Sequence, residues 1–256
     1  MKFTATIASP LPAGMPAGTT QQRVALPGGE RLDLLVVPLA EPALDEPAAD
    51  DALAALAERT LAWVAPATGA ALAIPLYGTH VTWSAGRAAV IGPPPRLEPL
   101  RTALGEFATI ECRLRQIEDG LAALAPHVQE DAALAFEFTE RGLPRRGELQ
   151  ARFCQAVSLR DRLAALAPEL HRPPSYPPTL ATQLGERLRE RSRIVERAEF
   201  AAARAEIVAG VYEGCGQRAA DFVLARRQNG LEWTIIILLV VQTLLVVAAL
   251  LAARRP

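Results

Sequence analysis

The residues that come nearest to catalytic groups are Tyr77, His80 and Trp83, which stand close together in the sequence. An imidazole gains and loses a proton near neutral pH, so His80 is the group that a pocket here would use for acid or base chemistry. None of the three histidines has a partner at the spacing of a metal site or a catalytic pair. The GxSxG, HExxH, Walker A and GxGxxG motifs are also missing. The favoured explanation of this motif is structural, with Gly78 in a tight turn and Trp83 in the core. An enzyme with an unrecognised pocket here is the alternative.

Two further sets of residues have chemical potential. Glu111, Glu118 and Asp119 could form a carboxylate cluster, but they lie largely opposite the apolar stripe of their segment, so we expect a solvated face. The cysteines are far apart and form no CxxC pair, which predicts reduced thiols rather than a disulfide framework or a zinc site. They are Cys112, Cys154 and Cys215. We therefore expect no metal and no cofactor.

Arginines are concentrated near residue 190, where Arg187 and Arg191 alternate with glutamates such as Glu186 and Glu190. Salt bridges along one helical face explain this pattern, and contact with an acidic partner or an RNA backbone is the alternative. The formal net charge is −1, which predicts no general attraction to DNA.

The most distinctive stretch of the chain is its apolar C-terminal run, from Trp233 to Ala253. About 20 apolar residues at about 1.5 Å each cross a hydrocarbon core about 30 Å thick. A buried core helix is the alternative, but soluble helices are seldom apolar on every face. Trp233 would lie at one interface of the bilayer, and Arg254 and Arg255 at the other. The sequence predicts a single transmembrane helix at residues 231–253.

Polar residues are rare within this run, and Gln242 and Thr243 fall near its middle. A buried amide in lipid needs a hydrogen-bonding partner. Association of several anchors through Gln242 and Thr243 is one explanation, and hydrogen bonding to their own helix is the other.

The expected topology follows from the N-terminus. Residues 1–10 contain no apolar run that would make a secretory signal peptide, so we expect a tail-anchored protein with its N-terminal bulk in the cytoplasm. Arginines flank the apolar run on both sides, so the positive-inside rule gives little guidance. Export of the bulk through the C-terminal span itself is the alternative.

The fold class predicted for the chain is α+β, beginning with a small mixed α/β head at residues 1–95. Alternating or short apolar runs separated by Gly and Pro predict strands. The expected strands are residues 3–7, 32–39, 71–77, 79–84 and 87–91. A helix between them is expected to be capped by Asp50 and to carry one apolar face. That face comprises Leu53, Leu56, Ala57, Leu61 and Val64.

Residues 96–230 are predicted to form a helical bundle or coiled-coil region. The first helix carries an apolar stripe at gaps of three and four residues and should end at Pro126. The stripe comprises Leu100, Leu104, Phe107, Ile110, Leu114, Ile117, Leu121 and Leu124. A second helix should run to Pro168 with Val157 among its inward residues.

A third and longer helix is expected from about residue 180 to Arg227, antiparallel to the first. Alanines such as Ala202 should line its inner face. Gly210, Gly214 and Gly216 each weaken such a helix, so we expect a bend there.

Two short motifs stand at opposite ends of the chain. The first combines an aromatic pair with a glycine and a valine and comprises Tyr77, Gly78, Val81 and Trp83. The second opens the apolar run and comprises Leu231, Glu232 and Trp233. Both resemble signatures of the required-for-meiotic-nuclear-division family, also called the YagE family, in which they occur in this order and at this spacing. Together with the helical middle, the resemblance spans most of residues 30–250.

The resemblance implies a divergent bacterial member of that family. The chain departs from the family at two positions, since the family usually has a glutamate where Gln242 stands and a histidine where Arg227 stands. Its mitochondrial members are inner-membrane proteins that face the matrix, form large homo-oligomers and support translation. We accordingly expect a non-enzymatic scaffold at the bacterial inner membrane that self-associates and tethers a cytoplasmic partner, such as the ribosome. A membrane-bound enzyme with a pocket at His80 is the alternative.

Overall fold

The computed structural model describes residues 3–6, 11–39, 47–65, 71–172 and 178–253. It confirms a mixed α+β chain with a sheet in the N-terminal part and long helices after it. The chain divides into two compact units, Met1–Asp119 with Asp161–Ala202 and Gly120–Arg160 with Ala203–Pro256. Helices α2, α3 and α5 each supply residues to both units. The domain limits at residues 95 and 230 stay a prediction.

The first unit contains a six-stranded sheet with the strand order β1-β2-β3-β6-β5-β4. Only the central pair, β3 and β6, is parallel. Five of these strands match the segments expected from the sequence. Strand β2 was not predicted, because its many polar residues obscure the alternation of apolar and polar positions. The strands are β1 Phe3–Thr6, β2 Thr20–Ala25, β3 Arg31–Pro38, β4 Leu72–Leu76, β5 Thr79–Ser84 and β6 Arg87–Gly92.

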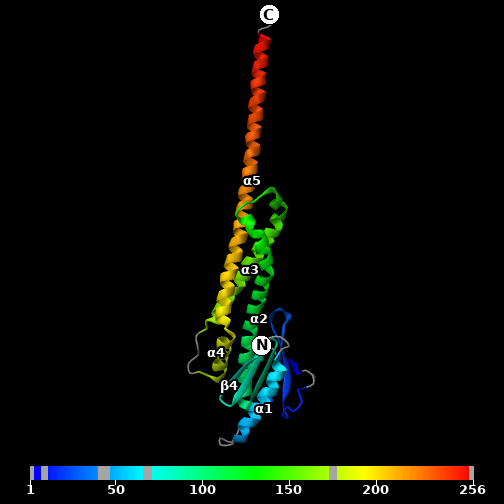
Figure 1. Ribbon diagram of the computed structural model, residues 1–256, viewed down its shortest axis with the longest axis vertical. Helices are drawn as coiled ribbons and strands as arrows, with labels where there is room; N and C mark the ends of the chain where they lie inside the picture. Colours follow the sequence, from blue (N-terminus) through cyan, green and yellow to red (C-terminus); the bar gives the residue numbers. More distant parts are fainter. Residues whose placement is uncertain (1–2, 7–10, 40–46, 66–70, 173–177, 254–256) are drawn as a thin grey trace. The chain divides into compact units, whose positions relative to one another are not determined.

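Helix α1, Pro47–Val64, covers one face of this sheet (Figure 1). Its buried Leu56 and Val64 pack on apolar side chains of β3 and β6. The helix begins at Pro47, so the prediction that Asp50 caps it is wrong. A proline fits the first turn because its missing N–H has no partner there in any helix.

Helix α2, Pro94–Asp131, carries the predicted apolar stripe, and all eight of its residues are buried. Phe107 of this stripe meets Trp83 of β5 edge to face, with ring centroids 5.1 Å apart, so α2 packs on the sheet face opposite α1. The helix does not end at Pro126 as expected but continues to Asp131. A proline costs a helix interior about 3 kcal/mol, and the contacts of its last turn offset this cost.

Helix α3, Arg146–Leu170, is the antiparallel partner of α2, because Leu159 lies against Gly120 whereas Arg152 reaches Asp131. Two short 3-10 helices connect α2 and α3, namely η2 Ala132–Ala135 and η3 Glu140–Arg145. Two expectations for α3 were wrong. Val157 is 43% exposed. The helix also passes Pro168 and ends at Leu170.

The expected single helix from residue 180 is interrupted once. Helix α4, Leu180–Ser192, ends at Arg193, whose backbone is left-handed at φ 51°, and α5, Ile194–Ala253, begins directly after it. Ala202 is exposed rather than inward, because the adjacent Ala201 takes the buried position on this side of α5.

Helix α5 is one uninterrupted helix through all three glycines. The bend expected in that region stays a prediction. The nearest atom to a Cβ at Gly214 would be the Cβ of Ala135 at 3.3 Å, so this glycine permits close packing. The antiparallel pairing with α2 was also wrong. Arg197 lies against Glu111 and Cys215 lies against Asp131, so α5 and α2 run in the same direction.

Candidate membrane anchor and buried charge clusters

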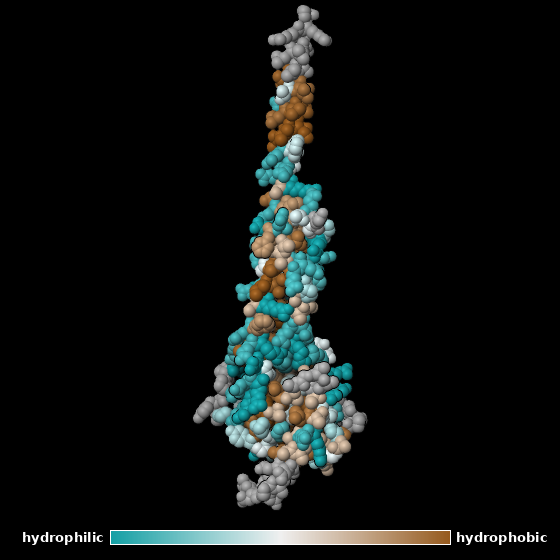
Figure 2. Space-filling model, in the orientation of Figure 1, coloured by the Kyte–Doolittle hydropathy of each residue, from teal (hydrophilic) through white to brown (hydrophobic). Residues whose placement is uncertain are grey.

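The C-terminal part of α5 is the most unusual surface among the described residues. It is the one helix there that is long and apolar enough to cross a membrane, and none of its apolar stretch is buried. Trp233 is 66% exposed and Leu238 is 62% exposed. Figure 2 shows the apolar stretch as a brown band on the visible face of α5. By length and composition this stretch could span a bilayer.

The polar residues of this stretch differ in their hydrogen bonding. The hydroxyl of Thr243 donates to the carbonyl of Leu239 at 2.7 Å, which satisfies it within its own helix. The side chain of Gln242 is exposed, and no hydrogen bond to it occurs within the described part of α5. Of the two positions expected to join anchors, Gln242 therefore has the greater need of an external partner.

The first of the two short motifs forms a tight hairpin turn between β4 and β5. Tyr77 and Gly78 have φ values of 43° and 71°, as a two-residue turn of this type requires. The guanidinium of Arg96 donates to the carbonyl of Tyr77 and holds the turn. The Tyr77 side chain itself is 72% exposed. The motif thus has a clear backbone role at these two residues.

His80 and Trp83 lie on opposite faces of the sheet. Trp83 pairs with Ala88 and packs on α2, whereas His80 pairs with Ile91, which belongs to the core under α1. Burial lowers the pKa of His80, and its Nδ1 atom has no hydrogen bond among the described residues. Tyr77, His80 and Trp83 are therefore not brought together into one pocket. Val81 points with Trp83 into the α2 side of the core, since its partner is Val90.

The residues of the second motif, Leu231, Glu232 and Trp233, are all exposed on α5 just where the apolar stretch begins. Arg187 and Arg191 are exposed on α4. Arg191 lies 3.5 Å from the carbonyl oxygen of Ala73, a contact at the limit of a hydrogen bond. Neither arginine takes part in a described ion pair with a neighbouring glutamate.

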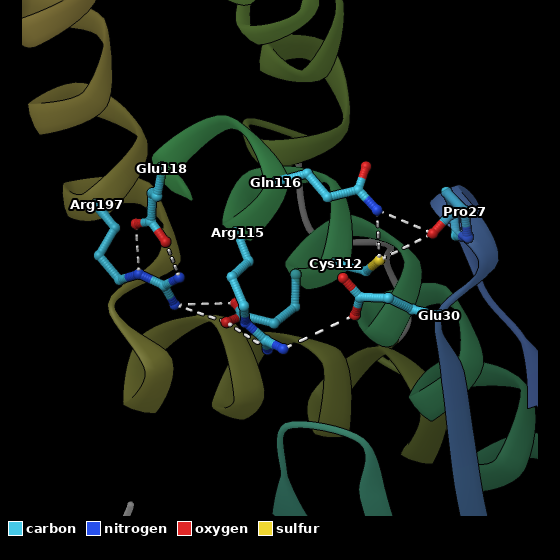
Figure 3. Close-up of polar contacts among 8 residues, drawn as sticks. Pro27, Glu30, Cys112, Arg115, Gln116, Glu118 and Arg197 are labelled. Carbon is cyan, nitrogen blue, oxygen red and sulfur yellow. Dashed lines mark hydrogen bonds and ion pairs between the residues drawn. The ribbon is translucent and has the colours of Figure 1, made fainter. Parts of the chain in front are cut away.

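A cluster of charges joins α2 to α5 in the first unit (Figure 3). Arg197 Nη1 lies 2.8 Å from Glu111 Oε1, and its Nη2 lies 2.7 Å from Glu118 Oε2. The Glu111 side chain is only 8% exposed, so the expected solvated face is wrong at this position. Hydrogen bonds to Glu118 and Glu111 raise the pKa of Arg197 further above its ordinary value despite its burial. One guanidinium thus pairs with two carboxylates, of which Glu111 is buried while Glu118 is 31% exposed.

This cluster continues along α2 toward the sheet. Arg115 lies 3.5 Å from Glu111 and 3.9 Å from Glu30. Beside it, the thiol of Cys112 faces the carbonyl oxygen of Pro27 at 3.3 Å. Burial, followed by the charge of Glu30, raises the pKa of Cys112 to about 11, so the thiol stays protonated and unreactive at neutral pH.

A second cluster lies in the second unit around Asp131, the last residue of α2. Its carboxylate is fully buried and accepts hydrogen bonds from Arg145 and Arg152, each at 2.5 Å. Tyr212 of α5 is 2% exposed, and its hydroxyl has no hydrogen-bond partner among the described residues. Burial and the nearby Asp131 charge raise the pKa of Tyr212 to about 12.

Beside this cluster, α3 and α5 enclose an open groove of about 480 Å³. Its lining includes the buried apolar side chains of Leu149 and Ala219 together with the exposed Gln150 and Gln217. Cys215 also borders it, and burial raises the pKa of this thiol. No sequence pattern predicts Asp131, Arg145 and Arg152 as a group, because their pairing depends on the chain reversal between α2 and α3.

Within the described residues, no group of three His, Cys, Asp or Glu side chains could hold a metal ion. Comparison with models of protein families, with curated proteins and with solved structures found no match.

Proposed function

We propose that this chain is a membrane-anchored scaffold whose α5 helix spans the bilayer with its C-terminal apolar stretch. The observation that carries the proposal is that this stretch is apolar on all sides and that no part of it is buried. An apolar surface of this size in water is strongly unfavourable, and a lipid bilayer covers every face of a helix at once.

The state of the charged groups supports a scaffold rather than an enzyme. Arg197 and Asp131, the centres of the two clusters, are each occupied by partners of opposite charge from the same chain. The buried thiols Cys112 and Cys215 have raised pKa values, which makes them poor nucleophiles. These groups hold helices together and are not poised to act on a substrate.

We further propose that the chain is a divergent bacterial member of the required-for-meiotic-nuclear-division family. The support is the order and spacing of the two motifs at Tyr77-Gly78 and Leu231-Glu232-Trp233. On this proposal the protein lies in the inner membrane with its N-terminal bulk in the cytoplasm and self-associates. It would organise a partner there, with the translation machinery as the first candidate and the exposed Arg187 and Arg191 as contacts.

The test compares the full chain with a version that ends at Asn229. Both are purified in mild detergent, their masses are measured by light scattering, and co-purifying molecules are identified. A matched control keeps the full length but carries Leu238→Arg and Val241→Arg, because each arginine at mid-span opposes insertion by about 3 kcal/mol.

We expect the full chain to fractionate with membranes, to form a defined oligomer and to retain a partner. The truncated chain and the double-arginine control should be released from membranes. If the full chain is released from membranes as readily as the truncated chain and the double-arginine control, the proposal of a membrane anchor is wrong. Bare monomers in all three preparations would instead remove the support for a tether.

A further inference from the structure

The connection between α2 and α3 is fastened to α5 shortly before the apolar stretch. Phe138 and Phe222 lie with ring centroids 6.0 Å apart, and one turn later Arg226 lies 3.1 Å from Glu140. Glu140 is the first residue of η3. The start of η3 therefore lies at the level of Arg226.

The helix geometry places this level close to the membrane. Arg226 precedes Trp233 by seven residues, which is about 10 Å along a helix. Tryptophan prefers the interface, and the polar layer outside the hydrocarbon is about 5–8 Å thick on each side. The start of η3 thus lies at the outer edge of the headgroup layer, and an extended arginine side chain reaches into it.

The charged groups at this level leave two arginines available. The Arg226 and Glu140 side chains are 64% and 72% exposed, so their ion pair is weak and easily exchanged. Arg227 is exposed and has no described ion pair. Two other acids lie near: Asp221 is paired with Arg218 at 3.9 Å, while Glu232 is exposed one residue before Trp233. A guanidinium forms paired hydrogen bonds with a phosphate, a group that phospholipids carry at this depth.

We propose that the start of η3 rests on the bilayer surface and that Arg226 and Arg227 bind the phosphates of phospholipid headgroups. This inference rests on the proposed function, because it takes the apolar stretch of α5 as the span. A surface contact of this kind would hold the second unit at a fixed height above the membrane instead of leaving it on a free stalk.

The test measures the depth of Thr139, which lies between Phe138 and Glu140. Its side chain is exposed and makes no capping hydrogen bond, so Thr139→Cys removes no contact. The variant is made in full-length chain with Cys154→Ser, since Cys154 is the exposed cysteine. It is labelled with a fluorophore in phospholipid nanodiscs that contain a lipid with a nitroxide on its headgroup. We expect strong loss of fluorescence.

Two matched labels make the result decisive. Native Cys154 lies two residues after Arg152, which binds Asp131 at the level of Cys215. Cys215 precedes Trp233 by 18 residues, which is about 27 Å along the helix. A label on Cys154 should keep its fluorescence. A label at Leu238→Cys should be quenched by a nitroxide deep in the acyl chains. If the label at Leu238→Cys is quenched but the label at Thr139→Cys keeps its fluorescence as Cys154 does, the proposed contact of η3 with the bilayer surface is wrong. The proposal of a membrane anchor then still holds. If Leu238 is not quenched, the anchor itself fails.

A second measurement addresses the phosphates. The unfolding temperature of the full chain is compared between phospholipid nanodiscs and a maltoside detergent, which carries no phosphate. The gain in phospholipid should shrink in a chain carrying Arg226→Gln and Arg227→Gln, and it should persist in Arg218→Gln. An equal gain in all three chains would overturn the role of the two arginines.

Discussion

Arg197 of α5 and Glu111 of α2 form an ion pair in which one guanidinium nitrogen lies 2.8 Å and 3.0 Å from the two carboxylate oxygens. The two residues are 86 positions apart in the sequence, and each is also part of a larger set of charges. Because Glu111 is buried, its charge depends on Arg197 for compensation.

Replacing Arg197 should therefore destabilise the first unit. Arg197→Ala leaves Glu111 buried beside Glu118 without its main counter-charge, and we expect a loss of about 1–3 kcal/mol in the free energy of unfolding. Urea denaturation followed by circular dichroism measures it. The control is Arg218→Ala, which removes an exposed pair with Asp221 on the same helix and should change nothing measurable. Equal effects of the two substitutions would show that the Arg197 cluster is only a surface feature.

The apolar pattern of α2 illustrates what the sequence could predict. A period of three and four residues identifies one face of a helix without reference to any other part of the chain, and every residue of the stripe is buried. The tight turn at Tyr77-Gly78 was equally local, since it follows from the glycine and the short strands around it.

The ion clusters and helix directions could not be predicted in the same way. Glu111 looks solvated from the α2 pattern alone, because the pattern does not show that α5 also packs on that side of α2. The break at Arg193 has no glycine or proline near it that would predict it. Such features depend on contacts between distant segments, which periodicity does not contain.

A larger loss is expected at Asp131, which is fully buried between Arg145 and Arg152. Asp131→Asn keeps the shape but leaves two guanidiniums facing each other without a carboxylate, so we expect a destabilisation of about 3 kcal/mol. Thermal unfolding of the full chain in detergent is the measurement. Glu148→Gln is the control, because Glu148 is 64% exposed and lies as far as 3.8 Å from Arg152, so the ion pair between them is weak. A variant as stable as the wild type would mean that the arginines find other partners.

Tyr212 gives a prediction about alkaline pH. Its pKa is raised from 10.0 to about 12 in the folded protein, so the folded state holds the phenol proton more tightly than the unfolded state. The stabilisation is fully present below pH 10 and is lost as the pH rises toward 12. Tyr212→Phe should therefore be as stable as the wild type at pH 7, since by geometry the hydroxyl has no hydrogen-bond partner among the described residues. It should also be less sensitive to pH above 10, because it has no phenol proton to lose. Denaturation curves at several pH values measure the free energy of unfolding of both proteins. If Tyr212 is not responsible, the wild type and Tyr212→Phe will lose the same amount of stability as the pH rises.

Two glycines of α5 should respond differently to alanine. A Cβ at Gly210 would meet no atom within 4 Å, so Gly210→Ala should stabilise the helix by about 0.5–1 kcal/mol. At Gly214 the new Cβ would lie 3.3 Å from that of Ala135, so Gly214→Ala should give a smaller gain or a loss. Urea denaturation of both variants tests the difference. Identical gains would show that Ala135 does not constrain this face of α5.

Gln242 provides the test of self-association within the membrane. If its exposed amide bonds to a second anchor, Gln242→Leu should weaken the oligomer by about 0.6–2 kcal/mol, which is roughly 3- to 30-fold in the association constant. Fluorescence energy transfer between labelled chains in lipid vesicles, measured at increasing dilution in lipid, gives that constant. The matched control is Thr243→Val, because the Thr243 hydroxyl already donates to Leu239 at 2.7 Å in its own helix and has no need of another acceptor. An unchanged association constant for Gln242→Leu would place the oligomer contacts, if the protein has them, outside the anchor. A loss in Thr243→Val equal to that in Gln242→Leu would point instead to close packing of this whole face of α5.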